Sequence, residues 1–331
     1  MKEALLEVLC EPGTRSALEL RNAETRDGEI WTGTLRSTSS GKEYPIRDGI
    51  PRFVPGDEYT DSFGFQWNRF SQVQLDSANG APYSRRRFDT EISFTPAEAR
   101  GKWMLDGGCG CGRFAEIAAE TGANVIAFDY SSAVDAARRN LTAKPNVHFV
   151  QGDLLNPPIK PGSLQFAYSI GVLQHTPNPR TAFSSILEML EPGGKFGFTI
   201  YGRRWYTYCY SKYWLRPITR KMDGPKLLRL IERDMPFWFG LTDVLFRIPG
   251  LGKVFQFLIP VANYVDKTEF TREQRYQEAI LDTFDMLSPS FDEPMTPEEA
   301  EVILNRFKVT DFQFRTRFPV NVTGSIPTAT R

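Results

Sequence analysis

Cysteine and histidine are scarce in this sequence of 331 residues, which holds four cysteines and two histidines. Cys109 and Cys111 lie in one glycine-rich run, so the cysteines do not suggest a disulfide framework. A reducing, cytoplasmic location fits this usage best. His148 and His175 alone leave little material for a metal site, and we predict no bound metal.

Net charge is also absent, because forty basic residues balance forty acidic ones. The chain therefore has no overall positive field to hold nucleic acid, and we expect no nucleic-acid partner. Long apolar runs are missing as well. The most apolar region, residues 236–265, is interrupted by charges, prolines and glycines; it is too short to span a bilayer but could lie on one. Glu3 and Glu7 stand where a signal peptide would be apolar, so we expect no export signal.

The most informative run is Lys102–Phe114, where an apolar strand pattern ends at Asp106 and a glycine-dense turn leads into a helical pattern. Gly108, Gly110 and Gly112 allow the backbone of that turn to adopt conformations that other residues avoid. A strand, a glycine turn and a helix in this order let backbone N–H groups approach a nucleotide-like ligand closely. The run therefore predicts an enzyme that depends on a cofactor.

Strand and helix patterns alternate through residues 101–201, which predicts an α/β protein with a parallel sheet covered on both faces. The expected strands are 103–106, 124–129, 147–151, 166–170 and 195–201, with two closing strands at 308–317 and 320–324. The expected helices are 112–121, 131–141 and 179–191.

The flanking segments differ in composition from this core. Residues 1–55 form a small β-rich module, in which Asp48-Gly49 predicts a hairpin turn. Residues 56–100 are aromatic and polar and predict short helices that lead into the core and cover its ligand. Residues 202–290 predict an aromatic, partly helical lid over the mouth of the sheet, and residues 291–331 return the chain to the core.

Two interpretations of the glycine turn compete. A dinucleotide fingerprint needs Gly-x-Gly-x-x-Gly, but Arg113 occupies the position of its last glycine. Asp106 would also bring negative charge toward a pyrophosphate. The run instead resembles motif I of the class I S-adenosylmethionine-dependent methyltransferases. Four further motifs follow in the family's order: Ile126–Asp129, Gln151–Leu154, Tyr168–His175 and Leu190–Lys195.

The resemblance covers residues 101–201 and implies a Rossmann-like, doubly wound, mostly parallel seven-stranded sheet that binds S-adenosyl-L-methionine. It implies that Asp129 accepts the ribose hydroxyls, Asp106 helps to orient the amino acid part and Asp153 accepts from the adenine amino group. Arg87 is a candidate for the methionine carboxylate, because guanidinium groups suit carboxylates; an exposed basic helix is the alternative. The remaining cofactor candidates are Gly108, Cys109, Gly110, Gly112, Tyr130, Ser131, Leu154, Ser169 and Ile170.

Residues 1–55 resemble the small zinc-ribbon-like module that precedes many methyltransferases. The two Cys-x-x-Cys pairs of that module align with Cys10, Gly13, Ser37 and Ser40, so three of the four ligands are absent. A structural zinc site needs all four ligands. The module is therefore expected to be degenerate and free of zinc.

Methyl transfer depends mainly on holding the nucleophile, the methyl group and the sulfur in line. A base is needed only if the attacking atom keeps its proton, and His175 is the candidate, with plain packing as its alternative. Tyr201 ends the fifth strand and faces the same opening. The candidates for substrate binding are Tyr206, Tyr210, Asp282 and Asp285; a solvated helix face and an aromatic core are the alternatives.

The sequence thus predicts methyl transfer to a small molecule, such as a specialised metabolite or a glycan or lipid precursor. Lipid or peripheral membrane contact through the lid is compatible with its aromatic composition. Two alternatives stay open: S-adenosylmethionine chemistry other than methylation, and a scaffold without catalysis. The identity of the acceptor and the oligomeric state do not follow from the sequence.

Overall fold

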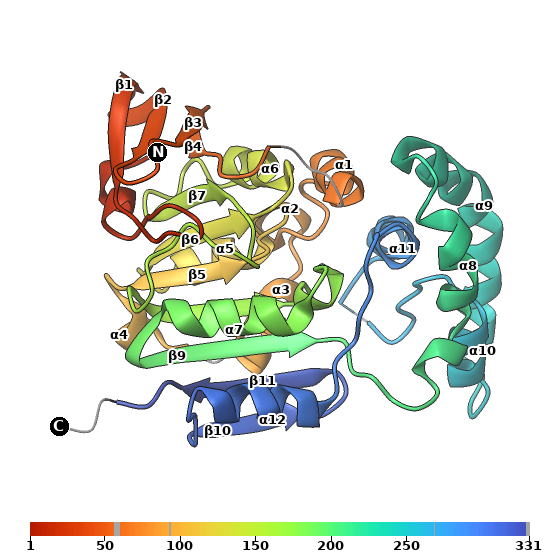
Figure 1. The fold of residues 1–331 in the computed structure, drawn as a ribbon. Coiled ribbons are helices and arrows are strands. Elements are labelled where there is room, and N and C mark those ends of the chain that lie inside the picture. Colours follow the sequence, from red (N-terminus) through yellow and green to blue (C-terminus); the bar gives the residue numbers. More distant parts are fainter. Residues whose placement is uncertain (56–59, 93, 268, 329–331) are drawn as a thin grey trace.

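Seven strands form the main sheet of the computed structural model, which describes residues 1–55, 60–92, 94–267 and 269–328 (Figure 1). The strand order is β10-β11-β9-β8-β5-β6-β7. Strands β5 to β9 pair in parallel, and β11 runs antiparallel to both of its neighbours. The strands are β5 (Trp103–Gly107), β6 (Asn124–Asp129), β7 (Val147–Gln151), β8 (Leu164–Ile170), β9 (Leu190–Ile200), β10 (Phe312–Thr316) and β11 (Val320–Ser325). This architecture confirms the predicted Rossmann-like fold.

Helices cover both faces of this sheet, because successive side chains of its central strands alternate between two apolar layers. Leu105 and Ile126 belong to one layer, and Met104 and Val125 belong to the other. The first layer includes α7 (Pro179–Met189) and α12 (Pro297–Arg306). The second includes α3 (Tyr83–Glu91), α4 (Pro96–Ala99), α5 (Arg113–Ala119) and α6 (Ala133–Asn140).

A small antiparallel sheet precedes the core and covers its edge strand. It contains β1 (Leu18–Arg26), β2 (Glu29–Ser37), β3 (Glu43–Arg47) and β4 (Ile50–Pro51), after the 3-10 helix Glu3–Glu7. Asp48 and Gly49 both have positive φ angles, 51° and 70°, as a two-residue hairpin turn requires, so the predicted hairpin is confirmed. Arg52 then forms an isolated parallel β-bridge with Gln151 of β7. The edge of the large sheet is therefore protected at this point.

A carboxylate ties the loops of this module together. Glu11 accepts hydrogen bonds from the hydroxyls of Ser37 at 2.8 Å and Tyr44 at 3.4 Å, and also from Ser40 and Thr14. These hydroxyl contacts, with that of Ser40 the strongest, lower the pKa of Glu11 to about 2. In the described part of the chain, no group of three His, Cys, Asp or Glu side chains is arranged to hold a metal.

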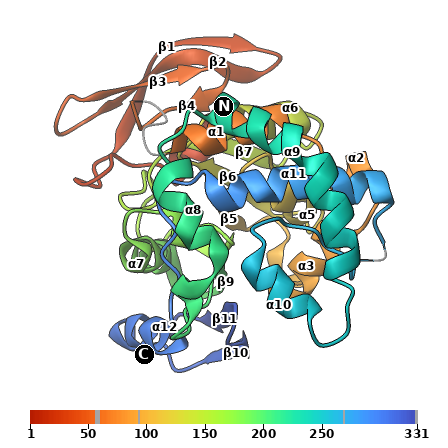
Figure 2. The ribbon, with the colours of Figure 1, turned by 90° about the vertical axis from the view of Figure 1, so that its right-hand side faces the viewer.

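A layer of helices stands beyond the ends of the parallel strands, on the side to which β9 points (Figures 1 and 2). It comprises α8 (Ser211–Thr219), α9 (Gly224–Leu245), α10 (Gly252–Leu258) and α11 (Arg272–Leu287), and α1 (Asp61–Arg69) joins it from the N-terminal side; α2 (Asp76–Asn79) leads from α1 to α3. Leu228, Ile231 and Phe239 of α9 pack with Phe284 of α11 in a separate apolar core. None of the helices in the described ranges is both long and apolar enough to cross a membrane.

Candidate functional site

The glycine turn after β5 is shaped by backbone conformations that favour glycine. Gly108 and Gly112 have φ angles of 89°, and Gly110 has 53°. A Cβ atom at Gly108 would lie 2.3 Å from a methyl carbon of Val172. The N–H groups of Gly108 and Cys109 both donate to the Phe128 carbonyl, at 2.8 and 2.9 Å. The turn is thus fixed against the end of β6.

Asp129 ends β6 beside this turn. Its Oδ2 accepts from the Gly110 N–H at 2.9 Å, and its Oδ1 accepts from the Ser131 N–H at 2.9 Å and the Ser131 hydroxyl at 2.7 Å. These contacts hold the carboxylate at the edge of the cavity that the glycine turn lines. The position and chemistry of Asp129 therefore suit the hydroxyls of a ribose.

Asp106 lies deeper than the turn. It is 2% exposed, and its Oδ2 has no hydrogen-bond partner among the residues described. Burial raises the pKa of Asp106 to about 8, which makes its carboxyl largely protonated at neutral pH. It pairs in register with Tyr168 of β8, at the floor of the site. Asp106 is not among the residues that line the cavity described next, so a direct contact with the cofactor stays a prediction.

A cavity of about 450 Å³ joins the glycine turn to the helical layer. At the sheet end it is lined by Gly108, Cys109, Gly110, Asp129, Tyr130, Leu154 and Ile170. At the lid end it is lined by His175, Tyr201, Tyr210, Lys212, Tyr264, Asp282, Asp285 and Asp292. The Trp67 ring of α1 packs so close to Gly110 that a Cβ there would lie 3.1 Å from it. One space thus has a nucleotide-like end and a polar, aromatic end.

Several residues expected to bind the cofactor lie just outside this lining. Ser131 supports Asp129, as described above. The Ser169 hydroxyl donates to the Gly107 carbonyl at 2.7 Å, and Asp153 accepts from the Leu155 N–H at 2.8 Å. Gly112 is the N-cap of α5. These residues hold the shape of the site, and a direct contact with the cofactor stays a prediction for each.

The structure does not bring Tyr206 to the cavity, although the aromatic run made it as good a candidate as Tyr210. The short 3-10 helix Thr207–Cys209 separates the two residues. Both rings contact Phe257, but Tyr206 accepts a hydrogen bond from Arg204 at 2.7 Å and is not part of the cavity lining, whereas Tyr210 lines the cavity. The turn between them thus directs only one ring inward.

His175 ends the 3-10 helix Leu173–His175, which follows β8. Its Nδ1 lies 3.0 Å from the Phe291 carbonyl oxygen. A carbonyl can only accept, so Nδ1 carries the proton and Nε2 of the neutral ring is the acceptor. Nε2 is buried and has no partner among the described residues. Burial lowers the pKa of His175 to about 4, so the ring is neutral at pH 7.

A buried ion pair that was not predicted from the sequence lies beside His175. Lys212 of α8 and Asp292, in the loop after α11, are 2.5 Å apart, and their side chains are 8% and 2% exposed. The Lys212 ammonium also lies 4.9 Å from the centre of the Tyr201 ring. Asp292 Oδ1 has no partner in the described ranges. Eighty positions separate the two residues, and no local pattern connects them.

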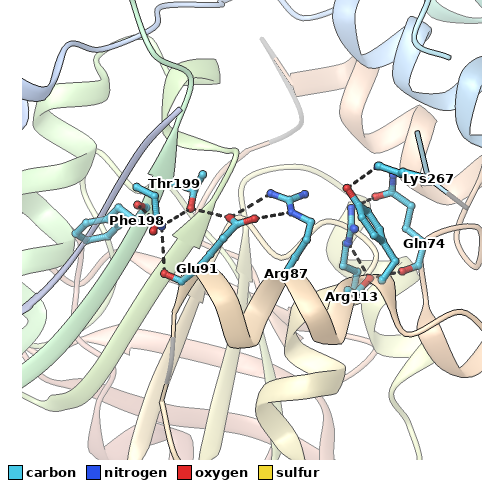
Figure 3. A network of polar contacts seen from close by, with 10 residues as sticks. Gln74, Arg87, Glu91, Arg113, Phe198, Thr199 and Lys267 are labelled. Carbon is cyan, nitrogen blue, oxygen red and sulfur yellow. Dashed lines mark hydrogen bonds and ion pairs between the residues drawn. The ribbon is translucent and has the colours of Figure 1, made fainter. Parts of the chain in front are cut away.

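The two arginines near the glycine turn have different environments (Figure 3). Arg87 donates from Nε and Nη2 to both oxygens of Glu91, at 2.6 and 3.2 Å. Arg113 donates from Nε to the Ser84 hydroxyl at 3.0 Å and from Nη1 to Gln74. Its Nη2 is buried and lacks a partner in the described part of the chain, and Arg113 lines the cavity. From the sequence, Arg113 was noted only because it departs from the dinucleotide-binding pattern, and it was not predicted to bind a ligand.

Asp282 and Asp285 of α11 both face the cavity. Asp282 accepts from Gln74 at 3.3 Å and from the Tyr264 hydroxyl, and Asp285 lies 3.4 Å from the amide nitrogen of Gln66. Burial, with the nearby charge of Asp282, raises the pKa of Asp285 to about 7. The pair therefore adds acceptor oxygens and negative charge to the lid end.

Comparison with known proteins agrees with this geometry. Residues 105–198 match the family described as "Methyltransferase domain". A sterol 24-C-methyltransferase of Gibberella zeae is 35% identical over 104 residues, 29% of this chain and 27% of that protein. A ubiquinone biosynthesis O-methyltransferase of Erwinia tasmaniensis is 29% identical over 136 residues, 40% and 52% of the two chains. The chain thus spans about half, or less, of the length of these relatives.

Among solved structures, phosphoethanolamine N-methyltransferase 1 of Haemonchus contortus, in complex with phosphoethanolamine and S-adenosylhomocysteine, is similar to this chain with a TM-score of 0.36. The two are 18% identical, and the match covers 46% of this chain and 34% of that one. The glycine turn and Asp129 fit a ribose-bearing ligand without phosphate. Residues 105–198 thus match a methyltransferase domain, and S-adenosylmethionine is the cofactor that the residues of the site fit.

Proposed function

We propose that this chain transfers the methyl group of S-adenosylmethionine to a small-molecule acceptor held at the lid end of the cavity. The observation that carries the proposal is the continuity of one cavity from Gly110 and Asp129 to Tyr201 and Lys212. The relatives act, by their names, on a sterol and in ubiquinone biosynthesis, which are small-molecule methylations. The balanced charge of the whole chain favours no nucleic-acid substrate.

Three residues account for cofactor binding in this proposal. Asp129 lines the cavity at the end of β6 and accepts the ribose hydroxyls. Leu154 contributes apolar contact near the third strand end. Arg113 donates from Nη2 to the methionine carboxylate, because a buried guanidinium nitrogen without a partner is costly until an anion meets it. Arg87 is less suited to this role, since Glu91 already occupies two of its donors.

In this proposal, His175 is the base that takes a proton from the substrate that receives the methyl group. The bound cofactor offers an electrophilic methyl group, and a neutral hydroxyl becomes a better nucleophile when it loses its proton. The tautomer fixed by Phe291 leaves Nε2 ready to take that proton. A base with a pKa near 4 is weak, so it suits an acidic hydroxyl of phenolic type better than an alkyl alcohol. Tyr201 and Tyr210 offer aromatic contact for such a ring.

The proposal is tested with isotopically labelled S-adenosylmethionine and a panel of phenols, alcohols and amines. We expect the label to enter a phenol, with a mass gain of one methyl group. We expect the His175→Gln variant to lose turnover while keeping its affinity for S-adenosylhomocysteine. His148→Gln is the matched control, because His148 is equally buried but packs on Trp103, away from the cavity. A product with another mass gain favours different chemistry, and failure to bind S-adenosylhomocysteine in calorimetry favours a scaffold.

A further inference from the structure

Large apolar side chains are exposed in the segment that forms the helical layer. We call the surface formed by six of these residues the outer lid face: Trp205, Trp214, Ile218, Phe237, Val244 and Val254. Their exposed fractions run from 49% for Val254 to 92% for Trp205. Figure 2 shows α8, α9 and α10 spread across the side of the molecule that faces the viewer. Soluble proteins rarely leave so many large apolar residues together without a binding role.

Helix geometry, rather than loose packing, exposes these residues. On α9, Phe237 and Val244 are seven positions apart and so share one side of the helix. Met235 and Phe239 are 2% exposed and face the apolar core shared with α11. On α8, Trp214 and Ile218 are four positions apart, on a common side. These four residues are therefore exposed from well-formed helices, whereas Trp205 lies in the turn that precedes them.

Positive charge is concentrated in the same segment. Residues 203–260 contain eleven basic and four acidic residues, an excess of seven positive charges in a chain whose total is zero. Lys226, Arg229 and Arg233 are exposed and precede Phe237 along the outer side of α9; Arg247 follows it. Exposed cations therefore stand on both sides of the apolar pair Phe237 and Val244. The remainder of the chain carries a matching excess of negative charge.

We propose that the outer lid face docks on the surface of a bilayer that contains anionic lipids. Tryptophan and phenylalanine side chains favour the boundary between headgroups and acyl chains. Lysine and arginine beside them are attracted to anionic headgroups, with a screened interaction that acts near the surface. Helix α9 offers both interactions at once, and no helix of the described ranges is suited to crossing the membrane. The association is therefore peripheral.

A second copy of the chain fits this surface less well. A twofold dimer places the same patch against itself. The exposed cations of α9 would then meet each other across the interface, and like charges brought together oppose association. An anionic lipid surface removes that conflict, because it supplies the opposite charge and an apolar layer behind it.

Docking would bring the lid wall of the cavity to the membrane. Tyr210 and Lys212 line the cavity, and Trp214 lies two positions further along α8 on the exposed side. The wall that encloses the acceptor end thus has the outer lid face as its other surface. The docking proposal does not depend on the acceptor, and its test needs no substrate.

The test is co-sedimentation with phosphatidylcholine vesicles, prepared with and without phosphatidylglycerol, at low and high salt. We expect binding to the anionic vesicles only, and weaker binding as salt rises. The Lys226→Gln, Arg229→Gln double variant should bind more weakly, by about fivefold for each charge removed. Phe237→Ser with Val244→Ser should remove most of the binding. Val302→Ser is the matched control, because Val302 on α12 is 53% exposed and lies outside the lid.

Circular dichroism and S-adenosylhomocysteine affinity should not change in these surface variants, which separates lost docking from lost folding. Equal binding to neutral vesicles, or no binding to either kind, overturns the proposal. Light scattering gives a third outcome that also overturns it. If the protein is a dimer that Phe237→Ser with Val244→Ser dissociates, the outer lid face is a contact between copies.

Discussion

Replacing Gly108 with alanine should destabilise the protein for two separable reasons. The φ angle of Gly108 is +89°, and a left-handed conformation costs an L-residue about 1–2 kcal/mol. The new Cβ would also lie 2.3 Å from Val172, and inserting a methyl group into a filled space costs about 1–3 kcal/mol. We therefore expect Gly108→Ala to lower the free energy of unfolding by about 2–5 kcal/mol. Urea unfolding monitored by circular dichroism measures this change.

Two further variants separate the two costs. Gly171 also has a positive φ, 72°, but a Cβ there meets nothing within 4 Å, so Gly171→Ala should show the conformational cost alone. Adding Val172→Ala to Gly108→Ala makes room for the new methyl group. The double variant should then recover about 1–3 kcal/mol relative to the sum of the two single changes. If Gly108→Ala is no worse than Gly171→Ala, or if the two changes are additive, the steric argument is wrong.

Three other predictions concern the site and its buried histidine. Asp129→Ala should weaken S-adenosylhomocysteine binding in calorimetry by about 1–3 kcal/mol; unchanged affinity would remove the ribose assignment. Arg113→Lys should weaken S-adenosylhomocysteine binding by about tenfold, which is the effect of one charged hydrogen bond. The same variant should bind 5′-methylthioadenosine with unchanged affinity, because that ligand lacks the amino acid part. Arg87→Lys is its control, and an equal loss for both ligands would contradict the carboxylate role of Arg113. His148 has its pKa lowered by burial from 6.5 to about 4, so the unfolded chain binds the proton more readily between these values. Its contribution to stability is therefore full above pH 6.5 and falls as the pH drops toward 4. His148→Gln should weaken this pH dependence in thermal unfolding, and curves that stay parallel would argue against it.

The parallel core could be predicted from the sequence because its signals are local. Strand β6 (Asn124–Asp129) was expected with the same bounds, and the hairpin at Asp48-Gly49 was expected from two residues. Buried strands read as apolar runs, and acids at their ends mark the edge where ligands bind. The predicted C-terminal end of α7 was less accurate. The expected helix reached 191, whereas α7 ends at Met189 and β9 begins at Leu190.

The acceptor end of the cavity could not be predicted in the same way, because it is assembled from segments far apart in the chain. Lys212 and Asp292 meet only because α8 packs beside α11 and the loop that follows it. The choice between Tyr206 and Tyr210 depended on a short 3-10 turn within an aromatic run that has no clear period. Such contacts follow from tertiary packing, and one sequence without its relatives holds no record of them.

In the N-terminal module, the carboxylate of Glu11 cross-links loops in the region where the sequence predicted a degenerate zinc-ribbon-like module. Ser37 and Ser40 stand at two of the positions aligned with zinc-binding cysteines, and both donate their hydroxyls to Glu11. Thiolates need a cation between them, because they are all acceptors. Hydroxyls are donors, so a carboxylate can take the central position between them. Since its pKa is about 2, Glu11 stays ionised at all but the most acidic pH, and the cluster needs no ion from outside.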